Sequence, residues 1–141
     1  RIYGCDKEEA EKRANEMMTQ FKLADRANDK AKSLSGGMQR RLSIAMALIS
    51  DPKVLFLDEP TLGLDVRARK NLWEAIAELK GKITIILTTH YLEEAENLAD
   101  RIGIMNNGKL KALGTVDEIL KITNKTKFED AFLSLTDTEV E

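Results

Sequence analysis

The chain has 141 residues, which is enough for one domain of ordinary size and too few for two. Hydrophobic residues make up 43% of it and charged residues 33%, and its two prolines and eight glycines are too few for a low-complexity or collagen-like chain. Lys and Arg number 22 against 24 Asp and Glu, so the net charge of −2 predicts no broad footprint for nucleic acid. The single cysteine, Cys5, excludes a disulfide-stapled scaffold, and no apolar run approaches the roughly 18 residues of a membrane span.

The first 50 residues predict a helical region. Asp6 followed by Glu9 indicates a helix cap, and apolar residues then recur at helical spacing as far as Phe21. Residues 23–33 are polar and without a clear period, which predicts a loop with at most a short turn. A second helix is expected over residues 38–50, and Asp51-Pro52 ends it because a residue before proline avoids the helical conformation. Its predicted inward face consists of Met38, Leu42, Ala45, Met46 and Ile49.

The middle of the chain alternates between strand-like and helical patterns. Residues 54–57 form a continuous apolar run, as expected for a strand covered on both faces, and residues 83–87 form a second buried strand. Helices are expected between and after them, over residues 65–80 and 92–99. With a third strand following, this order predicts an α/β fold with a mostly parallel sheet, right-handed crossovers and flanking helices.

The end of the chain predicts a hairpin and a helical tail. Residues 102–105 and 109–112 flank Asn107-Gly108, which is a strong signal for a two-residue turn between antiparallel strands. Two short helices are expected after the hairpin, at residues 116–122 and 128–135. Phe128, Phe132 and Leu135 lie on one face of the last helix.

Polar residues follow both buried strands. Asp58 and Glu59 come directly after the first strand, and His90 follows the second. Ligands of open parallel sheets bind beyond the carboxyl ends of the strands, so these side chains are expected near a phosphate and metal site. Asp58 can accept a hydrogen bond from a Mg²⁺-bound water, Glu59 can take a proton from an attacking water, and His90 can donate to a phosphate. Each residue taken alone also fits an ordinary solvated turn.

A glycine-rich turn leads into the second helix. Ser35, Gly36 and Gly37 combine a hydroxyl, free backbone N–H groups and two residues without side chains, which suits an anion that must approach the backbone closely. An ordinary Ser-capped helix would explain the same three residues. The run LFLDEP, which starts 20 residues after Ser35, favours the interpretation as a phosphate site.

Four segments together resemble the C-terminal part of an ATP-binding cassette (ABC) ATPase domain. LSGGMQRR at residues 34–41 resembles the family's signature motif, and VLFLDEPT at residues 54–61 resembles its Walker B segment. LGLD at residues 62–65 resembles the D-loop, and Thr89-His90 resembles the switch-histidine segment. They follow the family's order, and the resemblance covers nearly the whole chain.

The resemblance implies a role for each matching residue. In the family, ATP lies between two domains arranged head to tail. Asp58 would position Mg²⁺, Glu59 would polarise the attacking water, His90 would contact the γ-phosphate and Asp65 would couple the two sites. The signature residues would act on ATP held by the partner domain, and the residues implied in nucleotide binding are Ser35, Gly36, Gly37, Gln39 and Asp65. Met38 stands where many members carry Gln.

The phosphate-cradling motif Gly-x-x-x-x-Gly-Lys-Ser/Thr does not occur in the sequence. We therefore expect a P-loop NTPase-like α/β fold that lacks the P-loop strand and retains the end of a helical subdomain. The expected parts are residues 1–50 (helical subdomain with the signature helix), 51–124 (ATPase core) and 125–141 (helical tail). The start without Met also favours a fragment. Because the P-loop strand is missing, we expect the fragment to self-associate, exchange strands or have a loosened core, and not to hydrolyse ATP alone.

The parent protein is expected to be the ATP-binding and hydrolysing subunit of an ABC transporter. The tail at residues 128–136 is similar to that of drug-resistance-type exporter cassettes. The implied partners are a second cassette domain and a transmembrane permease at the cytoplasmic face of the membrane, with no nucleic acid. Two alternatives stay open: a non-transporter ABC ATPase, and a non-catalytic dimerisation module that uses Arg40-Arg41 and the helix at Asp6 as contact faces. Arg40-Arg41 also fits a solvated helix face.

Overall fold

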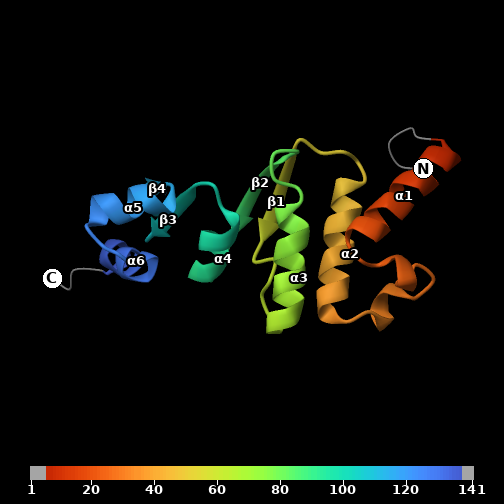
Figure 1. The fold of residues 1–141 in the computed structure, drawn as a ribbon, viewed down its shortest axis with the longest axis horizontal. Helices are drawn as coiled ribbons and strands as arrows, with labels where there is room; N and C mark the ends of the chain where they lie inside the picture. Colours follow the sequence, from red (N-terminus) through yellow and green to blue (C-terminus); the bar gives the residue numbers. More distant parts are fainter. Residues whose placement is uncertain (1–5, 138–141) are drawn as a thin grey trace. The chain divides into compact units, whose positions relative to one another are not determined.

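A computed structural model of the chain describes residues 6–137, so that Cys5 lies outside the described residues. Internal contacts divide the chain into two compact units, Arg1–Thr88 and Thr89–Glu141. Figure 1 shows the order of the helices and strands within each. The expected three-part division at residues 50 and 124 rests on the motifs and stays a prediction. Among residues 6–137, every helix is too short or too polar to span a bilayer.

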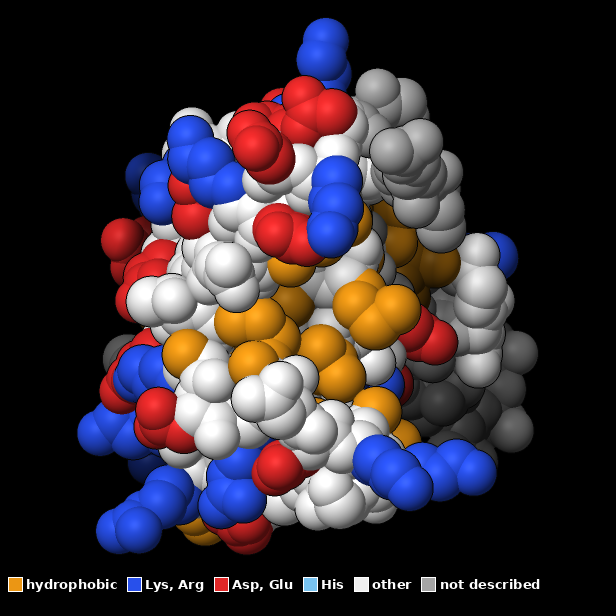
Figure 2. All heavy atoms as spheres, turned by 90° about the vertical axis from the view of Figure 1, so that its right-hand side faces the viewer, with side chains coloured by type: hydrophobic (Ala, Val, Ile, Leu, Met, Phe, Trp, Pro, Cys, Tyr) orange, Lys and Arg blue, Asp and Glu red, His pale blue; other side chains and the backbone are white. Residues whose placement is uncertain are grey.

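The first unit begins with the predicted helix, α1 (Lys7–Gln20). The Asp6 carboxylate accepts from the N–H of Glu9 at 2.8 Å, which confirms the predicted cap. No residue of α1 is fully buried. The side of the molecule that carries α1 shows a group of hydrophobic side chains ringed by charged ones (Figure 2). The predicted loop that follows contains two short 3₁₀ turns, Ala24–Arg26 and Ala31–Ser33.

The signature segment leads into α2 (Gly36–Leu48), which starts two residues earlier than predicted because Ser35 caps it. The predicted inward face of this helix is partly wrong. Met46 is 65% exposed, whereas Ile44 and Leu48 are buried. The difference arises because α2 contacts both α1 and α3 (Val66–Ala77), so two neighbours rather than one decide which of its faces is covered.

A parallel pair of strands lies at the centre of the first unit. β1 (Val54–Asp58) pairs with β2 (Thr84–Thr88), and α3 provides the crossover between them. Both strands were predicted, but for the described residues β1 is not covered on both faces and β2 is not buried, so both of these expectations are wrong. Phe56 is 72% exposed and its neighbour in register, Ile86, is 47% exposed. Successive side chains of a strand point to opposite faces, and only one face of this pair is covered within residues 6–137.

The second unit contains the predicted hairpin. β3 (Ile102–Asn106) pairs antiparallel with β4 (Lys109–Gly114). Asn107 and Gly108 both have positive φ values, 49° and 72°, as a tight turn between twisted strands requires. The described residues form two two-stranded sheets, β1–β2 and β3–β4, whereas the sequence predicted a single run of parallel strands. The Asn-Gly turn favours the local antiparallel pairing of β3 with β4.

Three helices pack around the hairpin: α4 (Leu92–Leu98), α5 (Val116–Thr123) and α6 (Phe128–Thr136). The core of the second unit combines hairpin and helix residues, namely Ile102, Ile104, Ala112, Ile119, Phe128 and Ala131. Phe132 and Leu135 pack against this cluster. The predicted apolar face of the last helix is therefore confirmed as part of a core.

Candidate functional site

The glycine-rich turn forms the N-terminus of α2. Ser35 is the cap residue, and its hydroxyl accepts from the N–H of Met38 at 3.4 Å. A Cβ added to Gly36 would meet nothing within 4 Å, so a ligand can approach the backbone there. A Cβ added to Gly37 would lie 2.9 Å from the Cβ of Ala68. Gly36 therefore leaves the turn open, whereas Gly37 allows α2 to pack closely against α3.

A small depression lies where the N-termini of these two helices meet, and its volume is about 190 Å³. Two arginines, Arg41 and Arg67, line it together with both cap residues, Ser35 and Asp65. Helix N-termini carry free N–H groups and a partial positive charge, and arginine pairs well with phosphate oxygens. The depression therefore has the chemistry of an anion site.

Two of the residues implied in nucleotide binding use their side chains within the fold. The amide of Gln39 donates to the carbonyl of Leu34 at 2.9 Å, which closes the turn that carries the glycines. The carboxylate of Asp65 accepts from the N–H of Ala68 at 2.9 Å and so caps α3. Gln39 thus shapes the turn, whereas Asp65 also lines the depression.

The two predicted acids stand at the carboxyl end of the parallel strand pair. Asp58 is the last residue of β1 and lies opposite Thr88 of β2 in register. The hydroxyl of Thr88 donates to the carboxylate of Asp58, and the N–H of Glu59 donates to the carbonyl of Thr88 at 3.0 Å. No motif in the sequence assigns a role to Thr88. Its position at the end of the neighbouring strand could have indicated a contact with Asp58, but only once the register of the two strands is known.

Glu59 has a backbone conformation that is uncommon for a residue with a side chain. Its φ is +45°, in the left-handed region. The carbonyl of Glu59 accepts from the N–H of Leu62 at 3.1 Å and from Nη2 of Arg40 at 3.4 Å. The signature helix and the Walker B segment of the same chain are therefore in direct contact.

The two adjacent arginines of α2 are not simply a solvated face. Arg40 is half-buried and reaches Glu59. Arg41 donates to the carbonyl of Phe21 at 2.8 Å, and partial burial lowers the pKa of Arg41 from its ordinary value. Each guanidinium therefore fixes α2 to another element.

The residues present fit one mode of magnesium binding. Within residues 6–137, no three His, Cys, Asp or Glu side chains gather as a protein-only metal cage. Mg²⁺ in nucleotide sites is usually held by one or two carboxylates together with phosphates and waters. Asp58, exposed at a strand end and oriented by Thr88, suits this mode.

His90 belongs to the second unit, where its ring is exposed. The ring centroids of His90 and Tyr91 lie 4.1 Å apart at an interplanar angle of 40°. The N–H of Tyr91 donates to the hydroxyl of Thr89 at 3.0 Å. The Tyr91 ring thus lies tilted against the ring of the predicted switch histidine.

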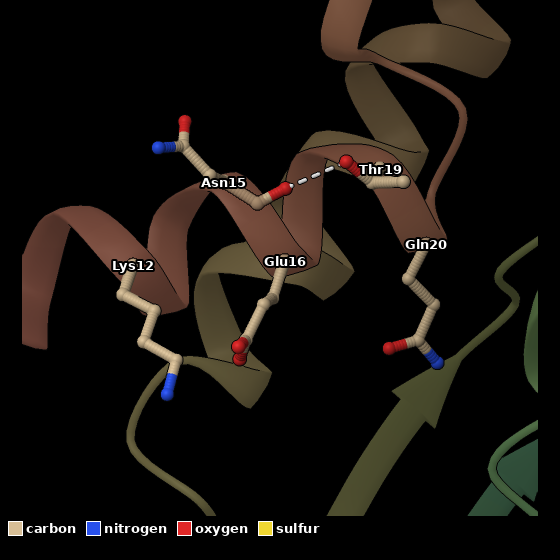
Figure 3. A pocket seen from close by; sticks show the side chains of 5 residues that line it. All are labelled: Lys12, Asn15, Glu16, Thr19 and Gln20. Carbon is tan, nitrogen blue, oxygen red and sulfur yellow. Dashed lines mark hydrogen bonds between the residues drawn. The ribbon is translucent and has the colours of Figure 1, made fainter.

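A larger hollow of about 690 Å³ lies beside α1 (Figure 3). The hydroxyl of Thr19 donates there to the carbonyl of Asn15 at 2.9 Å. Ligand pockets are usually enclosed and largely apolar, whereas this hollow borders a polar face of one helix. We assign no function to this hollow. The residues that line it are Lys12, Asn15, Glu16, Thr19 and Gln20.

Comparison with family models and solved structures shows which proteins this chain resembles. Residues 3–62 match the model of the ABC transporter family. A solved ATP-binding subunit of an ABC transporter superimposes with a TM-score of 0.78 at 33% identity, over 96% of this chain and 57% of that one. The chain is therefore similar to ATP-binding subunits of ABC transporters along nearly its whole length. An ABC transporter cassette solved in its ADP conformation gives a TM-score of 0.77 at 28% identity, over 94% of this chain and 53% of the other.

Two ABC relatives show how much of a longer protein the chain matches. The daunorubicin resistance ATP-binding protein DrrA3 of Streptomyces coeruleorubidus is 47% identical over 120 residues, which are 84% of this chain and 38% of that protein. ABC transporter A family member 9 of Arabidopsis thaliana is 48% identical over 121 residues, 86% of this chain and 12% of that protein. The chain thus spans less than half the length of these relatives. These comparisons confirm the predicted resemblance to the ABC family. They also confirm the predicted α/β fold, with the short parallel sheet of an ABC ATPase.

Proposed function

We propose that these residues supply the signature, Walker B and switch parts of the ATP-hydrolysing subunit of an ABC transporter of the drug-resistance exporter type. One observation carries the proposal. Among the described residues, the depression at the α2 N-terminus is lined by neither Asp58 nor Glu59. The turn that suits an anion and the acidic strand end therefore form two separate surfaces of the chain. A head-to-tail pair of cassettes requires this, because each ATP would contact one surface of each cassette.

The turn at Ser35 contacts ATP that the partner cassette holds. Gly36 leaves the backbone N–H groups open to a phosphate, and Ser35 offers a hydroxyl beside them. Gln39 and Asp65 act indirectly, because their side chains shape the turn and cap α3. Gly37 sets the spacing between the two helices and so belongs to the architecture of this surface.

The acidic strand end acts on ATP bound to its own cassette. When bound, Mg²⁺ neutralises charge on the phosphates, and Asp58 would hold it through a coordinated water. Glu59 takes the proton of the attacking water, a contribution typically worth about 10²–10⁴-fold in rate. His90 donates a hydrogen bond to the γ-phosphate as charge develops on it. No P-loop motif occurs in the 141 residues, so this chain alone is proposed not to turn over ATP.

The names of several relatives favour an exporter. They are daunorubicin, doxorubicin and linearmycin resistance ATP-binding proteins of Streptomyces coeruleorubidus, Mycobacterium tuberculosis and Bacillus subtilis. We infer that the partners of the full-length protein are a second cassette and a transmembrane permease, and that it works at the cytoplasmic face of the membrane. No partner among nucleic acids is proposed, since the net charge is −2.

The test is ATP binding and turnover of the full-length protein that contains these residues. Glu59→Gln keeps the size of the side chain and removes its basicity. The variant is expected to bind ATP as the wild type does and to lose about 10²–10⁴-fold in turnover. Absence of Mg²⁺-dependent hydrolysis in the wild type, or full turnover in the variant, would contradict the proposal.

A further inference from the structure

We propose that Arg40 is a positioning residue for Glu59, through which the signature helix holds the general base of its own chain. This inference deepens the proposed function and rests on it. Arg40 lies on α2, in the helical turn after the Ser35 cap, and its side chain is half-buried. Its Nη2 lies 3.4 Å from the carbonyl oxygen of Glu59. Nothing in this contact involves the carboxylate itself, so Arg40 acts through the backbone.

The backbone of Glu59 is held from three directions. Its N–H donates to the carbonyl of Thr88 at 3.0 Å, from the end of β2. Its carbonyl accepts from Leu62 at 3.1 Å, within the turn that follows β1, and from Arg40 of α2. Strand, turn and helix thus converge on one peptide segment. Arg40 is the one side chain among these three partners.

Such support matters because Glu59 has a φ of +45°. A residue with a Cβ is disfavoured in the left-handed region, and neighbouring contacts must maintain it there. The direction of the Glu59 side chain follows from this backbone conformation. Loss of the Arg40 contact allows the peptide to relax toward the common regions, which turns the carboxylate away from its position.

The position of Arg40 itself depends on the anchoring of α2. The next residue, Arg41, donates to the carbonyls of Phe21 and Lys22, at 2.8 and 3.5 Å. Two consecutive arginines therefore connect α2 to the end of α1 and to the residue after β1. A displacement of the signature helix is transmitted to Glu59 through this pair.

The experiment compares steady-state ATP hydrolysis by the full-length protein and its Arg40 variants. Arg40→Met is expected to lower kcat about 10- to 100-fold, the usual cost of a misplaced reacting group, with little change in the KM for ATP. Arg40→Lys should give an intermediate kcat, because an ammonium group also donates but lacks the planar fork of arginine. Lys70→Met removes an exposed cation from α3 as a matched control and should leave kcat unchanged.

A double variant separates positioning from a general structural effect. In a Glu59→Gln background, Arg40→Met should cause no further loss of turnover, since the group that Arg40 positions is already inactive. A wild-type kcat in Arg40→Met, a change in KM alone, or an equal loss with and without Glu59 would overturn the proposal. If Arg40→Met does not fold, the kcat of Arg40→Lys becomes the test. A wild-type kcat in Arg40→Lys would then count against the role of Arg40 in positioning Glu59.

Failure of this inference is distinguishable from failure of the proposed function. If the wild type hydrolyses ATP and Glu59→Gln does not, the proposed function stands. Unchanged kcat in Arg40→Met then removes only the role of Arg40. If Glu59→Gln retains full turnover, the general base itself is misassigned.

Discussion

The hydroxyl of Thr88 donates to the carboxylate of Asp58 across the parallel strand pair. The contact joins the last residues of β1 and β2, where ligands of parallel sheets bind. A donor on one carboxylate oxygen fixes its rotamer and leaves the other oxygen for a metal-bound water. Thr88 therefore orients the residue that we propose to position Mg²⁺.

Removal of the Thr88 hydroxyl should weaken the magnesium site. Thr88→Val keeps the β-branched shape, and we expect the Mg²⁺ concentration for half-maximal ATP hydrolysis by the full-length protein to rise at least about tenfold. Thr88→Ser should restore the wild-type value. Thr84→Val, at the opposite end of the same strand, serves as the control. An unchanged Mg²⁺ requirement in Thr88→Val would show that the hydroxyl has no such role.

The two glycines of the signature turn should respond differently to the same substitution. Gly37→Ala places a Cβ 2.9 Å from the Cβ of Ala68, and such overpacking typically costs about 1–3 kcal/mol in the free energy of unfolding. Gly36→Ala meets no atom within 4 Å and should leave the fold as stable as before. Urea denaturation of the two variants measures the difference. Equal midpoints would contradict the assignment of Gly37 to helix packing.

The Arg41 contacts should be important for stability. Arg41→Met leaves the carbonyl of Phe21 without its charged donor, and hydrogen bonds to charged groups contribute about 1.5–3 kcal/mol. Arg26→Met is the control, because its exposed ion pair with Asp29 is worth only about 0–1 kcal/mol. Chemical denaturation of both variants tests this. A loss in Arg41→Met no larger than that in Arg26→Met would contradict the anchoring role.

The exposed face of the parallel pair should promote association of the 141-residue chain with itself. Phe56 is 72% exposed beside Ile86, so two apolar side chains form a contiguous patch. Phe56→Thr should shift the chain toward the monomer in sedimentation experiments across a concentration series. Val66→Thr removes an equally exposed apolar residue from α3 and should not. A wild-type chain that stays monomeric at all concentrations would exclude this account.

Local patterns predicted local structure well. The cap at Asp6 and the Asn107-Gly108 turn are confirmed because each depends on a few neighbouring residues. The motifs also located both acids at the end of β1, since a strand fixes the position of the residue that follows it.

Features that depend on tertiary packing were missed. The buried face of α2 is set by two neighbouring helices, so its apolar period did not reveal that Met46 is exposed. Thr88 contacts Asp58, which lies 30 residues away, and Arg40 contacts Glu59, which lies 19 residues away. No pattern in these segments of the sequence predicts either contact.

We propose that the turn at Ser35 and the acid Glu59 belong to complementary halves of one ATP site, contributed by different cassettes. Ser35→Arg blocks the first half and Glu59→Gln inactivates the second. Each full-length variant, confirmed as folded, should lack turnover when it pairs with a copy of itself.

Mixing the two inactive variants tests this claim most directly. A mixed pair regains one intact site, so random pairing should restore about a quarter of the wild-type rate in a symmetric dimer. Recovery of ATP hydrolysis on mixing is therefore the expected result. A mixture that remains inactive, although the subunits exchange, would place Ser35 and Glu59 in the same half and contradict the account.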